Sequence, residues 1–248
     1  MVLFLRTKSS ERVGHHRVRQ SELDEVSALC NVPLTRDDLR TCVGENWLNS
    51  RVIDCYSILV QEQSNKRICI LSILIYTDIV ILGAKAAAEK HLKKMSLDSL
   101  DLIMFPMTLG TNQRGGGGEH HVLCVVDCVE KSISIYDSKM GSEQRHDQRA
   151  TTVLDCLGFK ASIDNQTFDK KEWKIKHVGQ EDTPQQRNGH DCGVFVCTLA
   201  YFLSKGKDME AEIQSHNCSI INYMTLQRQR IIMSLLNPRY PISLPFVD

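Results

Sequence analysis

One cysteine in this sequence lies where a nucleophile would be expected, at the point where a polar loop meets an apolar run. Cys192 follows Asp191 and precedes Gly193, and apolar residues then recur at helical spacing through Leu203. A helix that begins here directs its free N–H groups and the positive end of its dipole at the thiol, which favours the nucleophilic thiolate. The sequence therefore predicts a cysteine nucleophile on the first turn of a buried helix, which ends at Gly206.

A cysteine nucleophile needs a base, and the base needs an acceptor that orients it. Two β-rich runs, from His120 to Asp127 and from Ile133 to Asp137, are joined by a short polar connection and predict a hairpin. Its open end would bring His120, at the start of one strand, beside Asp137, at the end of the next. A carboxylate in that place fixes the tautomer and orientation of an imidazole, so His120 and Asp137 are the predicted partners of Cys192.

A glutamine and a possible metal site complete the candidate chemistry. Gln186 lies six residues before Cys192, so its amide can reach an oxyanion that forms on a substrate carbonyl. A metal site is the alternative for the histidine-rich strand, which carries His120, His121, Cys124 and Cys128. Side chains of a strand alternate between its faces, so these groups are poorly placed to share one ion. We therefore expect no metal and no cofactor.

Composition indicates a globular protein with free thiols. The chain has 248 residues, 30 of them basic and 30 acidic, so its charge gives no argument for nucleic acid or an anionic membrane as a partner. Its ten cysteines form no CxxC pair and fit reduced thiols in the nucleus or cytoplasm. The apolar stretch 68–83 predicts core segments rather than a membrane span, because it is short and contains Asp78.

The chain is expected to comprise an N-terminal extension, residues 1–32, that is partly ordered, and a main domain, residues 33–248. Thr35, with Asp38 three positions on, predicts a capped helix start. A buried strand is expected at 100–106, ended by Pro106. Residues 111–119, with four consecutive glycines, predict a mobile loop beside the site. Further elements are expected as helices at 50–60, 84–95, 142–157 and 213–236 and as a strand at 173–178.

Four motifs resemble those of the ubiquitin-like-protein-specific protease family, the SUMO (sentrin) proteases. They are Leu-Thr-Arg-Asp-Asp-Leu from Leu34, Trp-Leu-Asn from Trp47, the two strands with His120 and Asp137, and Pro-Gln-Gln-Arg-Asn-Gly-His-Asp-Cys-Gly-Val-Phe from Pro184. The order His, Asp, Gln, Cys is that of the family, as are the gaps of 17 between His and Asp and of 6 between Gln and Cys. The resemblance covers about residues 33–237.

The resemblance implies an α+β, papain-like cysteine protease fold, with a central mixed β-sheet flanked by helices, for residues 33–248. It implies cleavage after the C-terminal Gly-Gly of SUMO, in precursors or in conjugates on lysine. The implied roles are nucleophile for Cys192, base and acid for His120, orienting carboxylate for Asp137 and oxyanion-hole donor for Gln186. The backbone N–H of Cys192 would be the second donor. A narrow tunnel that admits only glycine would be lined by Trp47, His121 and Gly193.

Two positions depart from the family pattern. His121 stands where the family has a tryptophan, and Ser50 stands where it has an aspartate that helps to hold SUMO. An imidazole makes a smaller and more polar tunnel wall, and beside His120 it is expected to become charged as pH falls.

Three functions stay open. They are a SUMO protease, a protease of the same fold that acts on another ubiquitin-like modifier or a viral-type Gly-Gly-X site, and an inactive scaffold that binds a modifier. The presence of the whole set of catalytic side chains argues against the scaffold. The expected partner is SUMO or another ubiquitin-like protein. The chain is expected to act as a monomer in the nucleus or cytoplasm, without nucleic acid and without a membrane span.

Overall fold

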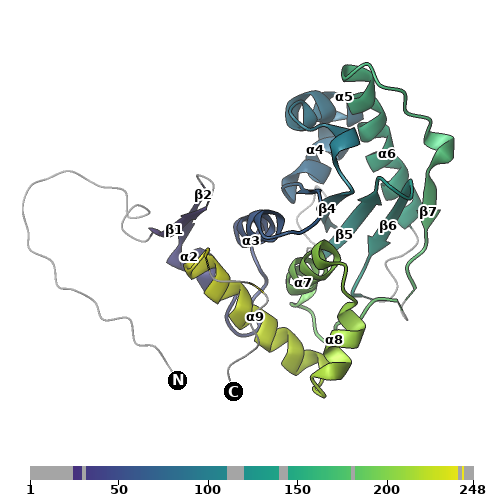
Figure 1. Ribbon diagram of the computed structural model, residues 1–248. Helices are drawn as coiled ribbons and strands as arrows, with labels where there is room; N and C mark the ends of the chain where they lie inside the picture. The colour runs from purple at the N-terminus through teal and green to yellow at the C-terminus, as the bar shows by residue number, and fades with distance from the viewer. Residues whose placement is uncertain are drawn as a thin grey trace, which may run out of the picture.

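The protein is built on one mixed five-stranded sheet (Figure 1). The computed structural model describes residues 25–29, 32–110, 120–139, 145–179, 182–239 and 242. Strand order in the sheet is β3-β4-β5-β6-β7, with antiparallel pairing in the centre and a parallel strand at each edge. The strands are β3 (Ile68–Ile70), β4 (Leu102–Leu109), β5 (His120–Asp127), β6 (Ser132–Tyr136) and β7 (Lys174–Lys176).

Helices cover both faces of this sheet (Figure 1). One face carries α3 (Ser50–Glu62) and α7 (Cys192–Lys205), and α9 (Ile220–Leu236) packs against both helices. The other face carries α4 (Leu74–Leu82), α5 (Ala84–Ala87) with the π-helical turn η1 (Ala88–Leu92), and α6 (His146–Ile163). Shorter elements are α2 (Arg36–Arg40), η2 (Leu97–Ser99), η4 (Lys170–Glu172) and α8 (Met209–Ser215). The predicted α+β fold, a mixed sheet flanked by helices, is confirmed.

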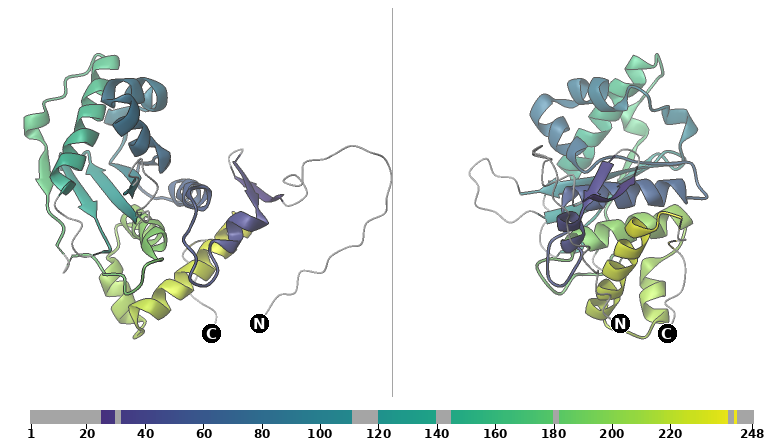
Figure 2. Two further views of the ribbon diagram at one scale, coloured as in Figure 1. Left: turned by 180° about the vertical axis from the view of Figure 1, so that it is seen from behind. Right: turned by 90° about the vertical axis from the view of Figure 1, so that its left-hand side faces the viewer.

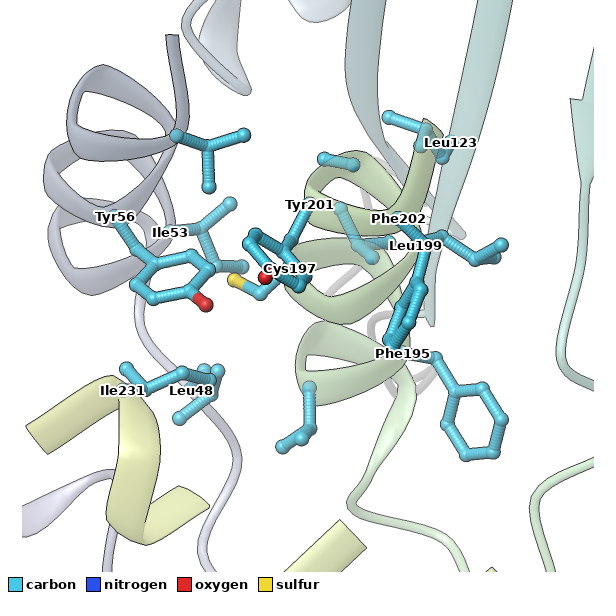
Figure 3. Close-up of a cluster of buried hydrophobic side chains, with 14 of the residues drawn as sticks. Leu48, Ile53, Tyr56, Leu123, Phe195, Cys197, Leu199, Tyr201, Phe202 and Ile231 are labelled. Atoms are coloured by element: carbon cyan, nitrogen blue, oxygen red, sulfur yellow. The ribbon is translucent and has the colours of Figure 1, made fainter. Parts of the chain in front are cut away.

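Alternation along the central strands divides the core in two. Leu123 and Val125 of β5 face α3, α7 and α9, whereas Val122, Cys124 and Val126 face α4 to α6. In the first core, Ile53 and Tyr56 of α3 point toward Cys197 and Tyr201 of α7 (Figure 3). Both faces of β5 are thus sealed from water, and this buried strand carries a predicted catalytic residue at its first position.

A two-stranded sheet lies at the edge of the molecule, beside α2 and one end of α9 (Figure 2). It pairs β1 (Glu25–Leu29) with β2 (Val32–Thr35) in antiparallel register. The predicted boundary after residue 32 falls within this hairpin, so the division into extension and main domain stays a prediction. Residues 1–24 of the predicted extension and the predicted glycine-rich loop at 111–119 lie outside the described residues.

The structure corrects several predicted element boundaries. The strand predicted to stop at Pro106 continues to Leu109. Proline fits there because β3 pairs with β4 only as far as Met104, so no parallel partner strand adjoins Pro106. The helix predicted at 142–157 begins at His146 and continues to Ile163. The segment predicted at 213–236 is two helices, α8 and α9.

The apolar stretch at 68–83 forms β3 and α4. The prediction of core segments holds only in part, because Ile75 and Ile79 are buried whereas Val80, Ile81 and Leu82 are exposed. Among the helices that the structure describes, none combines the length and the apolar character that a membrane span requires.

The capping box at Thr35 and Asp38 is present and links β2, α2 and α3. Asp38 accepts hydrogen bonds from Thr35 N and Oγ1 at 2.8 Å each and from Asn49 Nδ2 at 2.8 Å. Asn49 in turn caps α3 by accepting from Val52 N.

We predict that Asp38→Ala lowers the free energy of unfolding by about 1–3 kcal/mol, because it leaves several part-buried donors without an acceptor. Urea unfolding would measure the loss. Asp37→Ala is the matched control, since the Asp37 side chain is 78% exposed and pairs with an exposed arginine, and it should change stability by about 0–1 kcal/mol. Equal effects of the two substitutions would contradict a structural role for the capping box.

Candidate active site

The β5–β6 hairpin brings His120 and Asp137 together, as predicted. Its register pairs Leu123 with Tyr136, so the first residue of β5 and the residue after β6 lie at the same open end. His120 Nε2 lies 2.6 Å from Asp137 Oδ1. Because an ionised carboxylate can only accept a hydrogen bond, Nε2 is the donor, which leaves Nδ1 of the ring for another partner.

Burial and pairing together shift the protonation of both groups. Burial disfavours charge on His120, but its hydrogen bonds and charge interactions with Asp137 and Cys192 outweigh burial and raise the pKa of His120 to about 9. Burial also disfavours ionisation of Asp137, but hydrogen bonds, that of His120 first among them, lower the pKa of Asp137 to about 2. Near neutral pH the pair is therefore an imidazolium beside a carboxylate.

Cys192 supplies the third member of this group. It is the first residue of α7, as predicted, and its side chain hydrogen-bonds to His120. Burial raises the pKa of other thiols in the described part of the chain, which keeps them protonated and unreactive; these are Cys42, Cys69, Cys124, Cys128, Cys156 and Cys197. The contact with an imidazole thus distinguishes Cys192 from these buried thiols.

Two hydrogen bonds determine how the Gln186 amide lies. Ser138 Oγ donates to Gln186 Oε1 at 2.9 Å, and Gln186 Nε2 donates to the carbonyl of Asn188 at 2.6 Å. A backbone carbonyl only accepts, so the nitrogen end must face Asn188. One of the two amide protons therefore remains for a substrate oxygen. Gln186 N also donates to Ser138 O at 2.7 Å, which ties the loop to the residue after Asp137.

A buried ion pair holds the loop in front of Cys192. Arg228 of α9 donates from Nη2 and Nε to Asp191 Oδ1 at 2.7 and 2.9 Å, and both side chains are about 5% exposed. Nη2 also donates to His190 O at 3.1 Å. Asn188 Nδ2 donates to the other oxygen of Asp191 at 2.7 Å. The residue before the cysteine is thus fixed from α9 and from its own loop.

Two of the predicted tunnel residues, His121 and Gly193, lie close together at the start of α7. A Cβ on Gly193 would lie 3.0 Å from Leu48 Cβ and 3.5 Å from His121 Cδ2. The distance to Leu48 is tight for a Cβ, so glycine lets the first turn of α7 approach the segment after Trp47 closely, whereas the distance to His121 is an ordinary van der Waals contact. Trp47 is 38% exposed, whereas His121 is 3% exposed. The substrate-binding roles of Trp47, His121 and Gly193 stay predictions.

The expected charging of His121 at mildly acidic pH is wrong. Burial, together with the charge of His120, lowers the pKa of His121 to about 4. Its Nδ1 lies 3.2 Å from the hydroxyl of Thr108. His121 is therefore neutral near neutral pH, where His120 carries the proton.

Sequence reasoning missed Ser138, Asn188 and Arg228. Ser138 and Asn188 lie inside the motifs, but a short polar residue there can serve either to form a turn or to hold the site, and the sequence does not tell which. Arg228 had a usable signal: it is a charged residue on the face of α9 that also buries Met224 and Ile231. As for a metal, the described residues contain no group of three or more His, Cys, Asp or Glu side chains placed to hold an ion.

We predict that Arg228→Met lowers the free energy of unfolding by about 3–5 kcal/mol, because it leaves the Asp191 carboxylate buried without its cation. Calorimetry or urea unfolding would measure the loss. Gln229→Met, at the exposed neighbouring position of the same helix, is the matched control and should be close to neutral. An Arg228→Met protein as stable as the parent would show that the ion pair does not hold the loop.

The chain is similar in sequence to known proteins. Residues 46–231 match the model of the Ulp1 protease family, C-terminal catalytic domain. The chain is 28% identical over 187 residues to a sentrin-specific protease of Caenorhabditis elegans, covering 71% of this chain and 24% of that protein. It is 28% identical over 211 residues to sentrin-specific protease 2 of Rattus norvegicus, covering 83% of this chain and 34% of that protein. The chain thus spans about a quarter to a third of the length of these relatives.

The fold has a close counterpart among solved structures. The X-ray structure of the C-terminal Ulp1 protease domain in complex with Smt3, the yeast ortholog of SUMO, superposes with a TM-score of 0.69 at 21% identity, over 86% of each chain. This likeness shows that the sheet and helices described above form a Ulp1-like protease fold. Because the family model also matches well over half of the chain, the protein belongs to the Ulp1 protease family of cysteine peptidases.

Proposed function

We propose that the chain is a cysteine protease that cleaves after the C-terminal Gly-Gly of a SUMO-type modifier, in precursors or in conjugates on lysine. The observation that carries this proposal is the hydrogen-bonded series Asp137–His120–Cys192 in a Ulp1-like fold. Cys192 begins the buried helix α7, and the other two residues come from the β5–β6 hairpin. An inactive binding scaffold would not need a thiol paired with an imidazole whose pKa is about 9.

In the proposed reaction, the Cys192 thiolate attacks the carbonyl carbon of the terminal glycine. The oxyanion that forms is stabilised by the free amide proton of Gln186 and by the backbone N–H of Cys192 at the helix start. His120 then gives its proton to the leaving amine, and a thioester to Cys192 remains. Water, deprotonated by His120, hydrolyses the thioester, and Asp137 holds the imidazole in the required orientation through both steps.

The proposed substrate path runs over the start of α7. Trp47, His121 and Gly193 would flank the two glycines, whose lack of a Cβ allows a narrow passage. His121 is smaller than the tryptophan expected at this position, which makes another ubiquitin-like modifier the second candidate substrate. The reaction needs a reduced thiol, so we place it inside the cell, in the nucleus or cytoplasm.

Electrophilic probes made from a panel of ubiquitin-like proteins would test the function directly. Each probe carries a vinyl sulfone in place of the terminal glycine carboxylate. We expect a covalent adduct of the parent protein with a SUMO probe, mapped to Cys192 by mass spectrometry, and none with Cys192→Ser. Labelling only by a different modifier would select the second candidate. If no probe forms an adduct, the scaffold function is favoured. An adduct that persists in Cys192→Ser would show that Cys192 is not the nucleophile.

We predict that Gln186→Ala lowers kcat by about 10²–10³-fold if its amide is an oxyanion donor, with little change in modifier binding. Single-turnover cleavage of a SUMO precursor and a binding titration would separate the two effects. Arg187→Ala, the exposed neighbour in the same loop, is the control and should cleave at the parent rate. A Gln186→Ala protein as fast as this control would remove Gln186 from the mechanism.

A further inference from the structure

A second histidine lies against the proposed catalytic carboxylate. His146 is the first residue of α6, and its Nε2 lies 3.3 Å from Asp137 Oδ2. His120 contacts the other oxygen, Oδ1, at 2.6 Å. The side chains of His146 and Asp137 are 13% and 5% exposed, so solvent screens this contact poorly. The carboxylate therefore lies between two imidazoles, one on each oxygen.

The two oxygens of Asp137 have different surroundings. Oδ1 accepts from His120 and also from the backbone N of Lys139 at 2.9 Å. His146 approaches Oδ2 from a different element, at a distance longer than an ideal hydrogen bond and without its alignment. Catalytic contacts of this kind are often long before substrate binds and tighten when charge develops.

Rotation of the carboxylate is what a contact on Oδ2 would restrain. The terminal torsion of an aspartate has a broad energy profile, so each polar contact on the carboxylate narrows the range of its plane. The contact of His146 with Oδ2 adds to the bonds on Oδ1 in defining that plane. It thereby fixes the line from Oδ1 to His120 Nε2, on which the orientation of Nδ1 toward Cys192 depends.

The negative charge of the Asp137 carboxylate determines which form of the His146 ring can face it. A carboxylate whose pKa is held at about 2 is ionised at neutral pH and can only accept hydrogen bonds. His146 must therefore present an N–H, not a lone pair, from Nε2. The charge of Arg149, one turn further along α6, also acts on Asp137, so α6 contributes a further positive group toward the carboxylate.

We propose that His146 is a positioning residue for the reaction, which holds the plane of the Asp137 carboxylate so that His120 stays directed at Cys192. The proposal rests on the proposed function for its role in turnover. It adds to that function a side chain from α6, outside the motifs and outside the group Cys192, His120, Asp137 and Gln186.

Paired substitutions of His146 test the proposal. His146→Phe keeps a ring and removes the donor, and His146→Gln restores an N–H on a side chain of similar reach. We expect His146→Phe to lower kcat by about 10–100-fold with KM nearly unchanged, as loss of an outer partner of an oriented histidine typically does, and His146→Gln to recover most of the rate. The control is His177→Phe, which removes a 76% exposed histidine from a contact with Asp147 and should cleave as the parent does.

A second readout separates failure of this proposal from failure of the proposed function. The rate of Cys192 alkylation by iodoacetamide, followed by peptide mass spectrometry, depends on the His120 pairing and needs no ubiquitin-like substrate. We expect His146→Phe to slow alkylation and His146→Gln to restore it, even if no modifier probe labels the parent. A folded His146→Phe protein with parent-like alkylation and turnover would overturn the proposal. So would a His146→Gln protein no faster than His146→Phe.

Discussion

The hydrogen bond between His120 and Asp137 is the interaction on which the rest of the site depends. Each group would lose its charge if it were buried alone, since a low-dielectric interior disfavours ions. Together, at 2.6 Å, they keep opposite charges, and the imidazole acquires a pKa of about 9. The antiparallel register of β5 and β6 creates this contact, because it places the start of β5 beside the end of β6 at the open end of the hairpin.

Cys192, the proposed nucleophile, is held by packing at the start of α7 rather than by a strand of the sheet. The first turn of α7 lies so close to Leu48 that a Cβ at position 193 would be tightly packed, and glycine avoids this crowding. On its other side, the Asp191–Arg228 ion pair anchors the residue before Cys192 to α9. Ser138, the residue after Asp137, is hydrogen-bonded to Gln186 and so ties the Gln186 loop to the end of β6. Packing, a buried ion pair and loop hydrogen bonds thus fix the segments on either side of Cys192.

Local patterns were sufficient for the parts of the site that lie at element ends. The helix that begins at Cys192 and the hairpin that pairs His120 with Asp137 follow from periodicity and from the geometry of antiparallel strands.

Pro106 was misread because local chemistry forbids proline in a paired strand, and the sequence does not reveal how short β3 is. His121 was misread for a similar reason: its neighbour in sequence suggested charge, but burial, which depends on packing from distant segments, keeps it neutral. Arg228 lies 37 positions from its partner Asp191, and His146 lies 9 positions from Asp137, so only the folded chain brings each pair together.

The protonation of His120 tests the central claim most directly, because it reports the charge that Asp137 and Cys192 impose on the ring. Ring ¹⁵N NMR of histidine-labelled protein, with the His120 signals assigned from their absence in His120→Gln, would follow the titration without a substrate. The folded-state pKa lies above the ordinary 6.5, so we expect His120 to stay protonated at neutral pH and to lose its proton with a midpoint near pH 9. The midpoint should fall in Asp137→Asn, which removes the negative charge beside Nε2. A midpoint near 6.5 in the parent, unchanged by Asp137→Asn, would contradict the account.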